Sequence, residues 1–186
     1  MSQIRIEKVP VKVFYLGLIG FDHLQIAYQQ DDAITEQDGW YVLEGLRAAA
    51  NGGPSLGVLG TDGTTTLSEA NGDHTGADLI ADIGTPESRG SIIVNLSGSA
   101  AEAWETMASF GDSIDEQGLP YIAYSPPGFI IPTINSSSVV ASLLFFADID
   151  IRDVLPTGLR FSPGMQTLVG TSNDDELQIE IGRAHV

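Results

Sequence analysis

The sequence contains no cysteine, and it has few basic residues for its length. Eight Lys and Arg residues stand against 25 Asp and Glu residues in 186, so the formal net charge is −17. The lack of cysteine excludes disulfide bonds, thiolate metal ligands and thiol nucleophiles. An anionic surface of this kind repels nucleic acid and anionic membranes, so we expect neither as a partner.

The sequence also lacks a long apolar run. The longest strongly apolar stretch, residues 139–147, is too short to cross a bilayer, and acidic residues follow it. We predict that it forms a buried helix. Residues 1–30 lack the basic start and continuous apolar core of a secretory signal. We therefore expect any export to depend on a C-terminal signal outside this sequence.

Alternating apolar and polar residues predict strands in the first quarter of the chain. The pattern covers residues 4–9 and 11–16, which Pro10 separates. Residues 22–28 and 40–46 flank a turn-forming segment and together predict an antiparallel hairpin. Residues 51–76 are rich in Gly, Thr and Asn, which favours a long surface loop or an irregular hairpin.

Two helices are predicted in the second half, with further strands at residues 91–96 and 119–124. Ser99 to Glu102 matches a capping box, and the helix that follows is expected to bury Trp104, Met107, Ala108 and Phe110. Residues 135–138 form a hydroxyl-rich N-cap before the apolar stretch. We therefore predict an α+β domain over residues 1–164, with an antiparallel sheet packed against two main helices.

The segment at residues 168–177 resembles the opening of a calcium-binding RTX nonapeptide array. This resemblance implies a secreted, extracellular bacterial protein exported by a type I system, with a calcium-dependent β-roll beyond a truncated first repeat at residues 165–180. Asn173, Asp174 and Asp175 offer the hard oxygen ligands that Ca²⁺ prefers. A single turn has no stacked partner to complete the coordination shell, so we expect no bound Ca²⁺ in this fragment.

The last six residues, 181–186, are what one reading frame of a common sequencing adapter would encode. We interpret them as an adapter-derived tail on a metagenomic fragment. The natural C-terminus is then expected to lie beyond this sequence.

His23 and Gln25 are candidates for chemistry because they share one face of a predicted strand, opposite Leu24, Ile26 and Tyr28. A histidine strand followed much later by Asn135-Ser136 at a helix start resembles the permuted papain-like (NlpC-type) hydrolases. Those enzymes have Asn-Cys at the helix start, so serine here replaces the usual nucleophile. A serine hydroxyl is a weaker acid than a thiol and needs a well-held base.

The resemblance implies hydrolysis of an amide or ester bond by a Ser-His pair. His23 would deprotonate Ser136, and Glu44 or Gln25 would orient the His23 ring. Backbone N–H groups at the helix start would hold the oxyanion. Ser138 is the fallback nucleophile because the serine cluster leaves the register open.

Each of these residues also has a structural interpretation. Ser136 can simply be a helix N-cap, and His23 can be a half-buried strand histidine bonded to a backbone carbonyl. Glu44 can be a solvated carboxylate at a strand end. The acidic cluster of Asp148, Asp150 and Asp153 favours a solvated face over a metal site.

Two functions from other classes remain open. The first is a non-catalytic binding or adhesin module of a secreted RTX protein, with aromatic side chains in a groove for a carbohydrate, peptide or protein. The second is assistance in folding or export of the repeat array. The aromatic candidates for a binding groove are Trp40, Tyr41, Tyr121, Tyr124 and Phe129.

Overall fold

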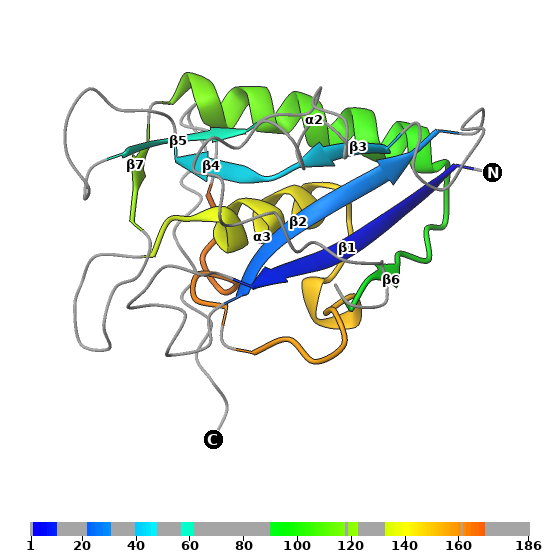
Figure 1. Cartoon of the computed structure of the whole chain (residues 1–186). Helices are drawn as coiled ribbons and strands as arrows, with labels where there is room; N and C mark the ends of the chain where they lie inside the picture. Colours follow the sequence, from blue (N-terminus) through cyan, green and yellow to red (C-terminus); the bar gives the residue numbers. More distant parts are fainter. Residues whose placement is uncertain are drawn as a thin grey trace.

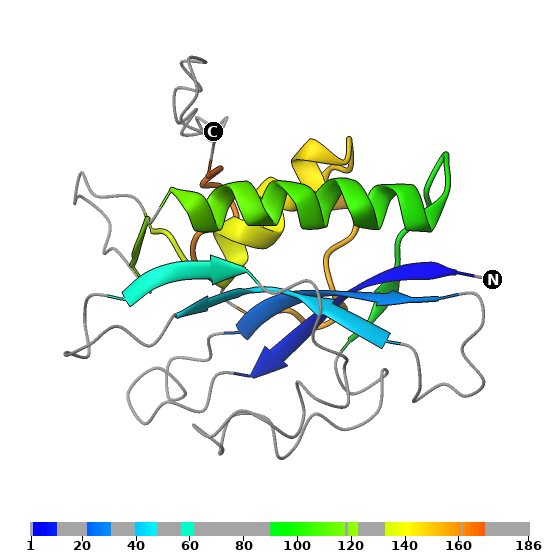
Figure 2. The ribbon, with the colours of Figure 1, turned by 90° about the horizontal axis from the view of Figure 1, so that it is seen from above.

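The protein has a four-stranded antiparallel sheet with two helices packed on one of its faces (Figures 1 and 2). This arrangement confirms the predicted α+β class. The computed structural model describes residues 2–10, 22–30, 40–47, 57–61, 90–117, 119–122, 133–160 and 162–169.

The main sheet has the strand order β3-β2-β1-β6. β1 (Gln3–Pro10) pairs with β2 (Asp22–Gln29) along its whole length, from Gln3 opposite Gln29 to Pro10 opposite Asp22. β2 also pairs with β3 (Trp40–Leu43), which confirms the predicted antiparallel pairing of these two segments. β6 (Ile92–Ile93) adds a short strand on the outer side of β1.

A second antiparallel sheet has the order β4-β5-β7, formed by β4 (Gly45–Arg47), β5 (Gly57–Thr61) and β7 (Pro120–Tyr121). Only Glu44 separates β3 from β4, so the predicted strand 40–46 is divided between two sheets. β5 lies inside the segment 51–76 predicted as a loop or irregular hairpin, and it pairs with β4, which precedes that segment.

The predicted strand at residues 91–96 is shorter in the structure. Within residues 91–96, only Ile92–Ile93 forms ladder pairs, and one further bond joins Val94 N–H to the Ile4 carbonyl at 2.9 Å. Of the predicted strand 119–124 the structure describes residues 119–122, where β7 covers Pro120–Tyr121 and Ile122 forms an isolated bridge with Ile134. The predicted strand 11–16 lies outside the described residues.

Helix α2 (Ala100–Glu116) begins at the predicted cap, where the Ser99 hydroxyl accepts a hydrogen bond from the Glu102 N–H at 3.4 Å. Its core-facing residues recur every three or four positions, as expected for an amphipathic helix. The Trp104 ring stacks on Tyr28, with 5.2 Å between ring centroids. The buried apolar side chains include Trp104, Met107 and Phe110, as predicted, and also Ile114, whereas Ala108 is half-buried.

Helix α3 (Ser136–Phe146) is the centre of the core. Its residues from Ser136 to Leu144 are all buried, because α3 packs against α2, β2 and β4. This environment explains why the stretch is apolar on every side rather than along one stripe. The core cluster joins α3 to the inner face of the main sheet, and its central members are Ile4, Ile6, Leu24, Ile26, Val139, Val140, Leu143 and Leu144.

The C-terminal end of α3 is closed by two backbone bonds. The Asp148 N–H donates to the Phe145 carbonyl at 3.1 Å, and the Ile149 N–H donates to the Leu144 carbonyl at 2.9 Å. These bonds form a Schellman motif, in which the residue after the C-cap adopts a left-handed conformation. Asp148 occupies that position with φ of 58°, where glycine is usual.

Replacing Asp148 with glycine is expected to raise the free energy of unfolding by about 0.5–1 kcal/mol, because glycine avoids the left-handed strain of an L-residue. Asp148→Asn keeps the size and shape of the side chain but removes a negative charge from the negative end of the helix dipole. A smaller gain in the free energy of unfolding is expected for it. Urea denaturation of the three proteins measures both effects. A less stable Asp148→Gly variant would contradict this account.

The chain after α3 passes through a short 3₁₀ helix, η2 (Ile151–Asp153), which Asp150 caps. Hydrogen bonds from the Arg152 side chain and backbone lower the pKa of Asp150 to about 2. Asp148, Asp150 and Asp153 are exposed, and no group of acidic or histidine side chains in the described ranges is arranged to hold a metal ion. The exposure of these three carboxylates is that of a solvated face.

The last described segment returns along α3 (orange in Figure 1). We call residues 157–160 and 162–169 the C-terminal strap. Its first residue, Thr157, donates its N–H to the Gly90 carbonyl at 3.0 Å, and its last, Val169, donates to the Ser142 hydroxyl at 2.6 Å. Val169 is buried and belongs to the core cluster.

Candidate functional site

The two faces of β2 differ as the sequence alternation predicts. Leu24, Ile26 and Tyr28 belong to the core beneath the helices. His23 and Gln25 lie on the opposite face, where register places His23 opposite Val9 and Gln25 opposite Glu7. His23 therefore faces away from the core beneath the helices.

Gln25 is engaged by a carboxylate of β1. Its Nε2 donates to Glu7 Oε2 at 3.0 Å, and both side chains are almost completely buried. Because Gln25 is used in this pair, it is not the residue that contacts the His23 ring. Of the two residues proposed to orient His23, the structure brings Glu44 to it.

The His23 ring contacts Glu44 through Nε2 and Oε2, as a hydrogen bond or ion pair. The contact arises because β2 and β3 pair antiparallel and Glu44 follows β3 directly. The two side chains are 21% and 9% exposed, so the pair is partly shielded from water. A carboxylate only accepts hydrogen bonds, so Nε2 carries the proton and Nδ1 of a neutral ring is left as the base.

The serine cluster starts helix α3 with a complete capping box. Asn135 Oδ1 accepts hydrogen bonds from the N–H groups of Ser137 and Ser138, at 2.9 and 3.2 Å. The Ser138 hydroxyl in turn accepts from the Asn135 N–H at 2.8 Å and donates to the Asn135 carbonyl at 2.7 Å. Ser138, the fallback nucleophile, therefore has its proton committed to the cap.

Ser136 differs from the serines around it. The Ser137 hydroxyl bonds to that of Ser162 at 2.6 Å, and the Ser142 hydroxyl donates to the Ser138 carbonyl at 2.8 Å. The Ser136 hydroxyl has no hydrogen-bond partner among the described residues, and the residue is 4% exposed. It is thus the one hydroxyl of the helix start that is not committed to a structural bond in the described chain.

Gly45, the residue after Glu44, packs against the start of α3. A Cβ atom placed on Gly45 would lie 2.9 Å from Ser136 Cα and 2.7 Å from Val139 Cγ2, so backbone and helix are in direct contact. Glu44 is the preceding residue. In the described chain, however, no hydrogen bond joins His23 to Ser136 or Ser138.

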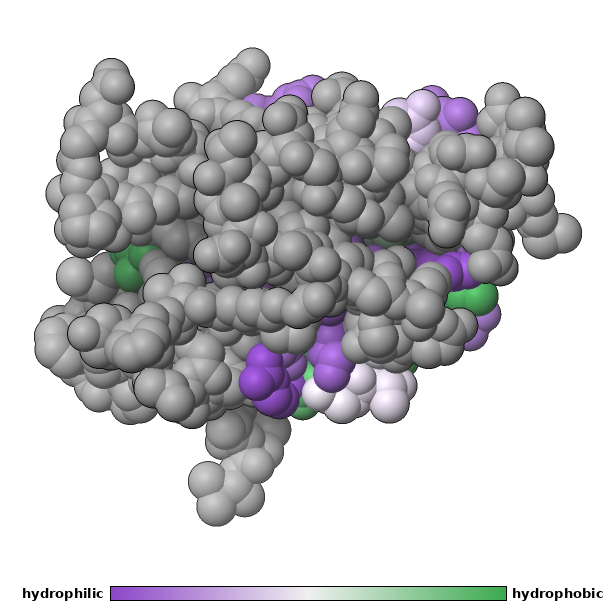
Figure 3. Space-filling model, viewed as in Figure 1, coloured by the Kyte–Doolittle hydropathy of each residue, from purple (hydrophilic) through white to green (hydrophobic). Residues whose placement is uncertain are grey.

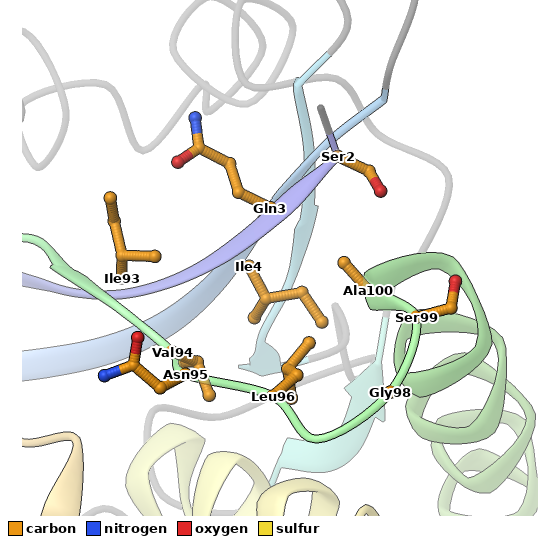
Figure 4. Close-up of a pocket in the computed structure, with 10 residues that line it drawn as sticks. All are labelled: Ser2, Gln3, Ile4, Ile93, Val94, Asn95, Leu96, Gly98, Ser99 and Ala100. Carbon is orange, nitrogen blue, oxygen red and sulfur yellow. The ribbon is translucent and has the colours of Figure 1, made fainter.

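A separate pocket of about 700 Å³ lies at the other end of the main sheet (Figure 4). It is formed by the start of β1, by β6 and the chain after it, and by the start of α2. Gln3 in this pocket pairs with Gln29, which is six residues along β2 from His23 and thus about 20 Å away. The polar side chains lining it are those of Ser2, Gln3, Asn95 and Ser99.

Several sequence-based candidates lie outside the described residues. These include the calcium ligands Asn173, Asp174 and Asp175 and the adapter-like tail. Of the aromatic residues proposed for a binding groove, Tyr41 is half-buried and lies 6.5 Å from Trp104 between ring centroids, so it takes part in packing. The other side chains in that set are outside the described part: Trp40, Tyr121, Tyr124 and Phe129.

Sequence reasoning missed an ion pair beside the site. Asp22 accepts hydrogen bonds from Arg160 Nη2 at 2.6 Å and from the Arg160 N–H at 2.7 Å. The Asp22 carboxylate raises the pKa of the Arg160 guanidinium through these bonds. No local pattern signals a contact between residues 138 positions apart.

The described surface gives no broad apolar area on the face seen in Figure 3, where described residues are mainly hydrophilic with small hydrophobic patches. No described helix combines the length and apolarity needed to cross a membrane. Comparisons of the chain with protein-family models, with curated proteins and with solved structures gave no match. The function is therefore inferred from the chain's own residues.

Proposed function

We propose that this chain is a hydrolase of an amide or ester bond, with Ser136 as nucleophile and the His23–Glu44 pair as its base. The observation that carries the proposal is the His23–Glu44 contact, one residue along the chain from a backbone packed against Ser136. A permuted papain-like layout, secretion and an attached calcium-binding RTX array belong to the same proposal. They rest on the sequence resemblances.

In the proposed first chemical step, which requires the His23 ring to come within hydrogen-bond reach of Ser136, the Ser136 proton passes to His23 Nδ1 while the serine oxygen attacks the substrate carbonyl. His23 then protonates the leaving group, which departs from an acyl-serine. Water, deprotonated by His23, releases the acid and restores the serine. Glu44 stabilises the imidazolium that forms in each half of the cycle.

The oxyanion needs a donor that the helix cap has not used. The capping box occupies the N–H groups of Ser137 and Ser138, and the Val139 N–H donates to the Asn135 carbonyl. Of the first helical residues, Ser136 is the one whose N–H has no partner in the described chain. We assign this N–H, at the positive end of the α3 dipole, to the oxyanion.

Labelling with a serine-reactive fluorophosphonate probe tests this proposal. We expect Ser136→Ala to abolish labelling and His23→Ala to slow it by at least about a hundredfold, because the hydroxyl then lacks its base. Ser138→Ala is the matched control, since it removes a neighbouring hydroxyl that serves the cap, and it is expected to remain labelled. Each variant is compared by the second-order rate of labelling at equal folded concentration.

Two outcomes would contradict a Ser-His hydrolase. One is labelling that persists in Ser136→Ala, and the other is a folded wild-type protein that the probe does not label. Circular dichroism and urea denaturation establish that each protein is folded before the rates are compared.

A second candidate, non-catalytic binding of a carbohydrate or peptide, is favoured by the pocket in Figure 4. Its amide and hydroxyl groups suit a neutral polar ligand, and Ile93 beside them is 53% exposed. None of the described residues that line this pocket is acidic or basic. An unlabelled, folded protein that binds glycans or peptides, and loses them in Asn95→Ala, would support this function instead.

A further inference from the structure

A buried chain of hydrogen bonds connects the start of α3 to the start of β2 through the C-terminal strap. The Ser162 hydroxyl donates to the Asp22 carbonyl at 3.0 Å and lies 2.6 Å from the Ser137 hydroxyl. Ser137, Ser162 and Asp22 are all buried. The strap therefore joins two elements that are more than 100 residues apart in sequence.

The direction of each bond follows from counting protons. A backbone carbonyl can only accept, so the single Ser162 proton is donated to Asp22. The bond between the two hydroxyls must then use the Ser137 proton, with Ser162 as acceptor. The hydroxyl protons of Ser137 and Ser162 are therefore both used in these hydrogen bonds, so neither residue is available as a nucleophile.

Both ends of this chain of hydrogen bonds are adjacent to the proposed catalytic residues. Ser137 follows Ser136, and Asp22 precedes His23, so each end is one Cα–Cα step of about 3.8 Å from a reacting residue. The strap is itself held in place on either side of Ser162. Arg160 donates to Asp22, and the Pro163 carbonyl accepts from Asn135 Nδ2 at 3.0 Å.

Gly164 permits this close approach of the strap to the helix cap. Its φ of +94° favours glycine, and a Cβ atom there would lie 2.8 Å from Asn135 Oδ1. The strap thus touches the cap residue, the residue after the candidate nucleophile and the residue before the candidate base.

We propose that Ser162 is a positioning residue, which fixes the first turn of α3 against the start of β2 and so sets the position of Ser136 relative to His23. The effect of Ser162 on catalysis rests on the proposed function. The geometric part, the placement of His23 by the strap, does not depend on hydrolysis.

The test compares Ser162→Ala with Ser137→Ala, because both remove the bond between the hydroxyls but only Ser162→Ala also removes the bond to Asp22. Both variants are expected to slow fluorophosphonate labelling about tenfold, since small displacements of reacting groups are costly. The double variant is expected to be no slower than Ser162→Ala. Ser162→Thr, which keeps the hydroxyl, should restore labelling, and Ser113→Ala on the outer side of α2 is the control.

The second readout is the NMR signal of the His23 ring in ¹⁵N-labelled protein, assigned with His23→Gln. We expect the chemical shift of this signal to change in Ser162→Ala and Ser137→Ala, and to be unchanged in Ser113→Ala. A wild-type protein that the fluorophosphonate probe does not label would refute the hydrolase proposal but not the positioning role. The His23 signal would then decide whether Ser162 positions His23. Wild-type labelling rates and unchanged His23 signals in folded Ser162→Ala would overturn the inference.

Discussion

Replacing Gly45 with alanine is expected to lower the free energy of unfolding by about 3 kcal/mol, because the site has no room for a methyl group. The added Cβ would lie 2.7 Å from Val139 Cγ2 and 2.9 Å from Ser136 Cα. The second contact is with backbone, which no side-chain rotation can relieve. Either α3 or the β3–β4 junction would have to shift, and chemical denaturation would measure the cost.

Gly98→Ala is the matched control for this prediction. A Cβ atom on Gly98 meets no other atom within 4 Å, so a change of less than about 0.5 kcal/mol is expected there. Val139→Ala relieves the side-chain contact but leaves the backbone contact in place. After the cost of Val139→Ala itself is subtracted, the double variant Gly45→Ala/Val139→Ala should therefore recover only part of the stability that Gly45→Ala loses. Equal stability of Gly45→Ala and Gly98→Ala would show that the helix is not in tight contact with this junction.

Arg160→Ala is expected to cost about 3–4 kcal/mol, because it leaves the Asp22 carboxylate buried without its cation. The Asp22 side chain is 1% exposed, whereas that of Arg160 is 44% exposed. The opposite deletion, Asp22→Ala, leaves a guanidinium that can still reach water. We therefore expect a smaller loss of about 2 kcal/mol for Asp22→Ala, from hydrogen bonds to a charged group.

Urea denaturation of both single variants and of the double variant gives this asymmetry and the coupling energy. Arg160→Lys serves as a control that keeps the charge but not the forked geometry of the guanidinium, so an intermediate loss is expected. A larger loss for Asp22→Ala than for Arg160→Ala would mean that the buried carboxylate is compensated by other groups.

Those parts of the fold that depend on short-range patterns could be predicted from the sequence. The alternation in residues 22–28 fixes which face of β2 is apolar, and Ser99 and Asn135 cap the two helices as their positions suggest. Such signals are local, because a strand face or an N-cap is decided by residues within one turn or two.

Features that depend on distant contacts could not be predicted in this way. The division of residues 40–46 at Glu44 follows from the pairing of β3 with one sheet and β4 with another. The short strands β6 and β7 each pair through two residues with a strand that is distant in sequence. The strap from residue 157 to 169 has no periodic pattern, because its contacts are single hydrogen bonds to several different elements.

The candidate site was also predictable only in part from the sequence. His23, Glu44 and Ser136 could be selected because each residue type suits its proposed chemistry, and the structure brings His23 and Glu44 together. Sequence alone could not separate Glu44 from Gln25 as the partner of His23, since the choice depends on Glu7 across the sheet. Nor could it show that Ser138 is committed to the capping box.

The strap also has a consequence for how the domain is made. Lys8 donates to the Gly158 carbonyl, and Asp22 bonds Arg160, so the first two strands are secured by residues that are synthesised more than 100 positions later. A nascent chain whose synthesis has passed only α3 contains β2 and the start of α3, but it lacks the hydrogen bonds of the strap that join them. Contacts of such long sequence separation slow folding, so the native domain is expected to form after synthesis has passed residue 169 rather than progressively during it.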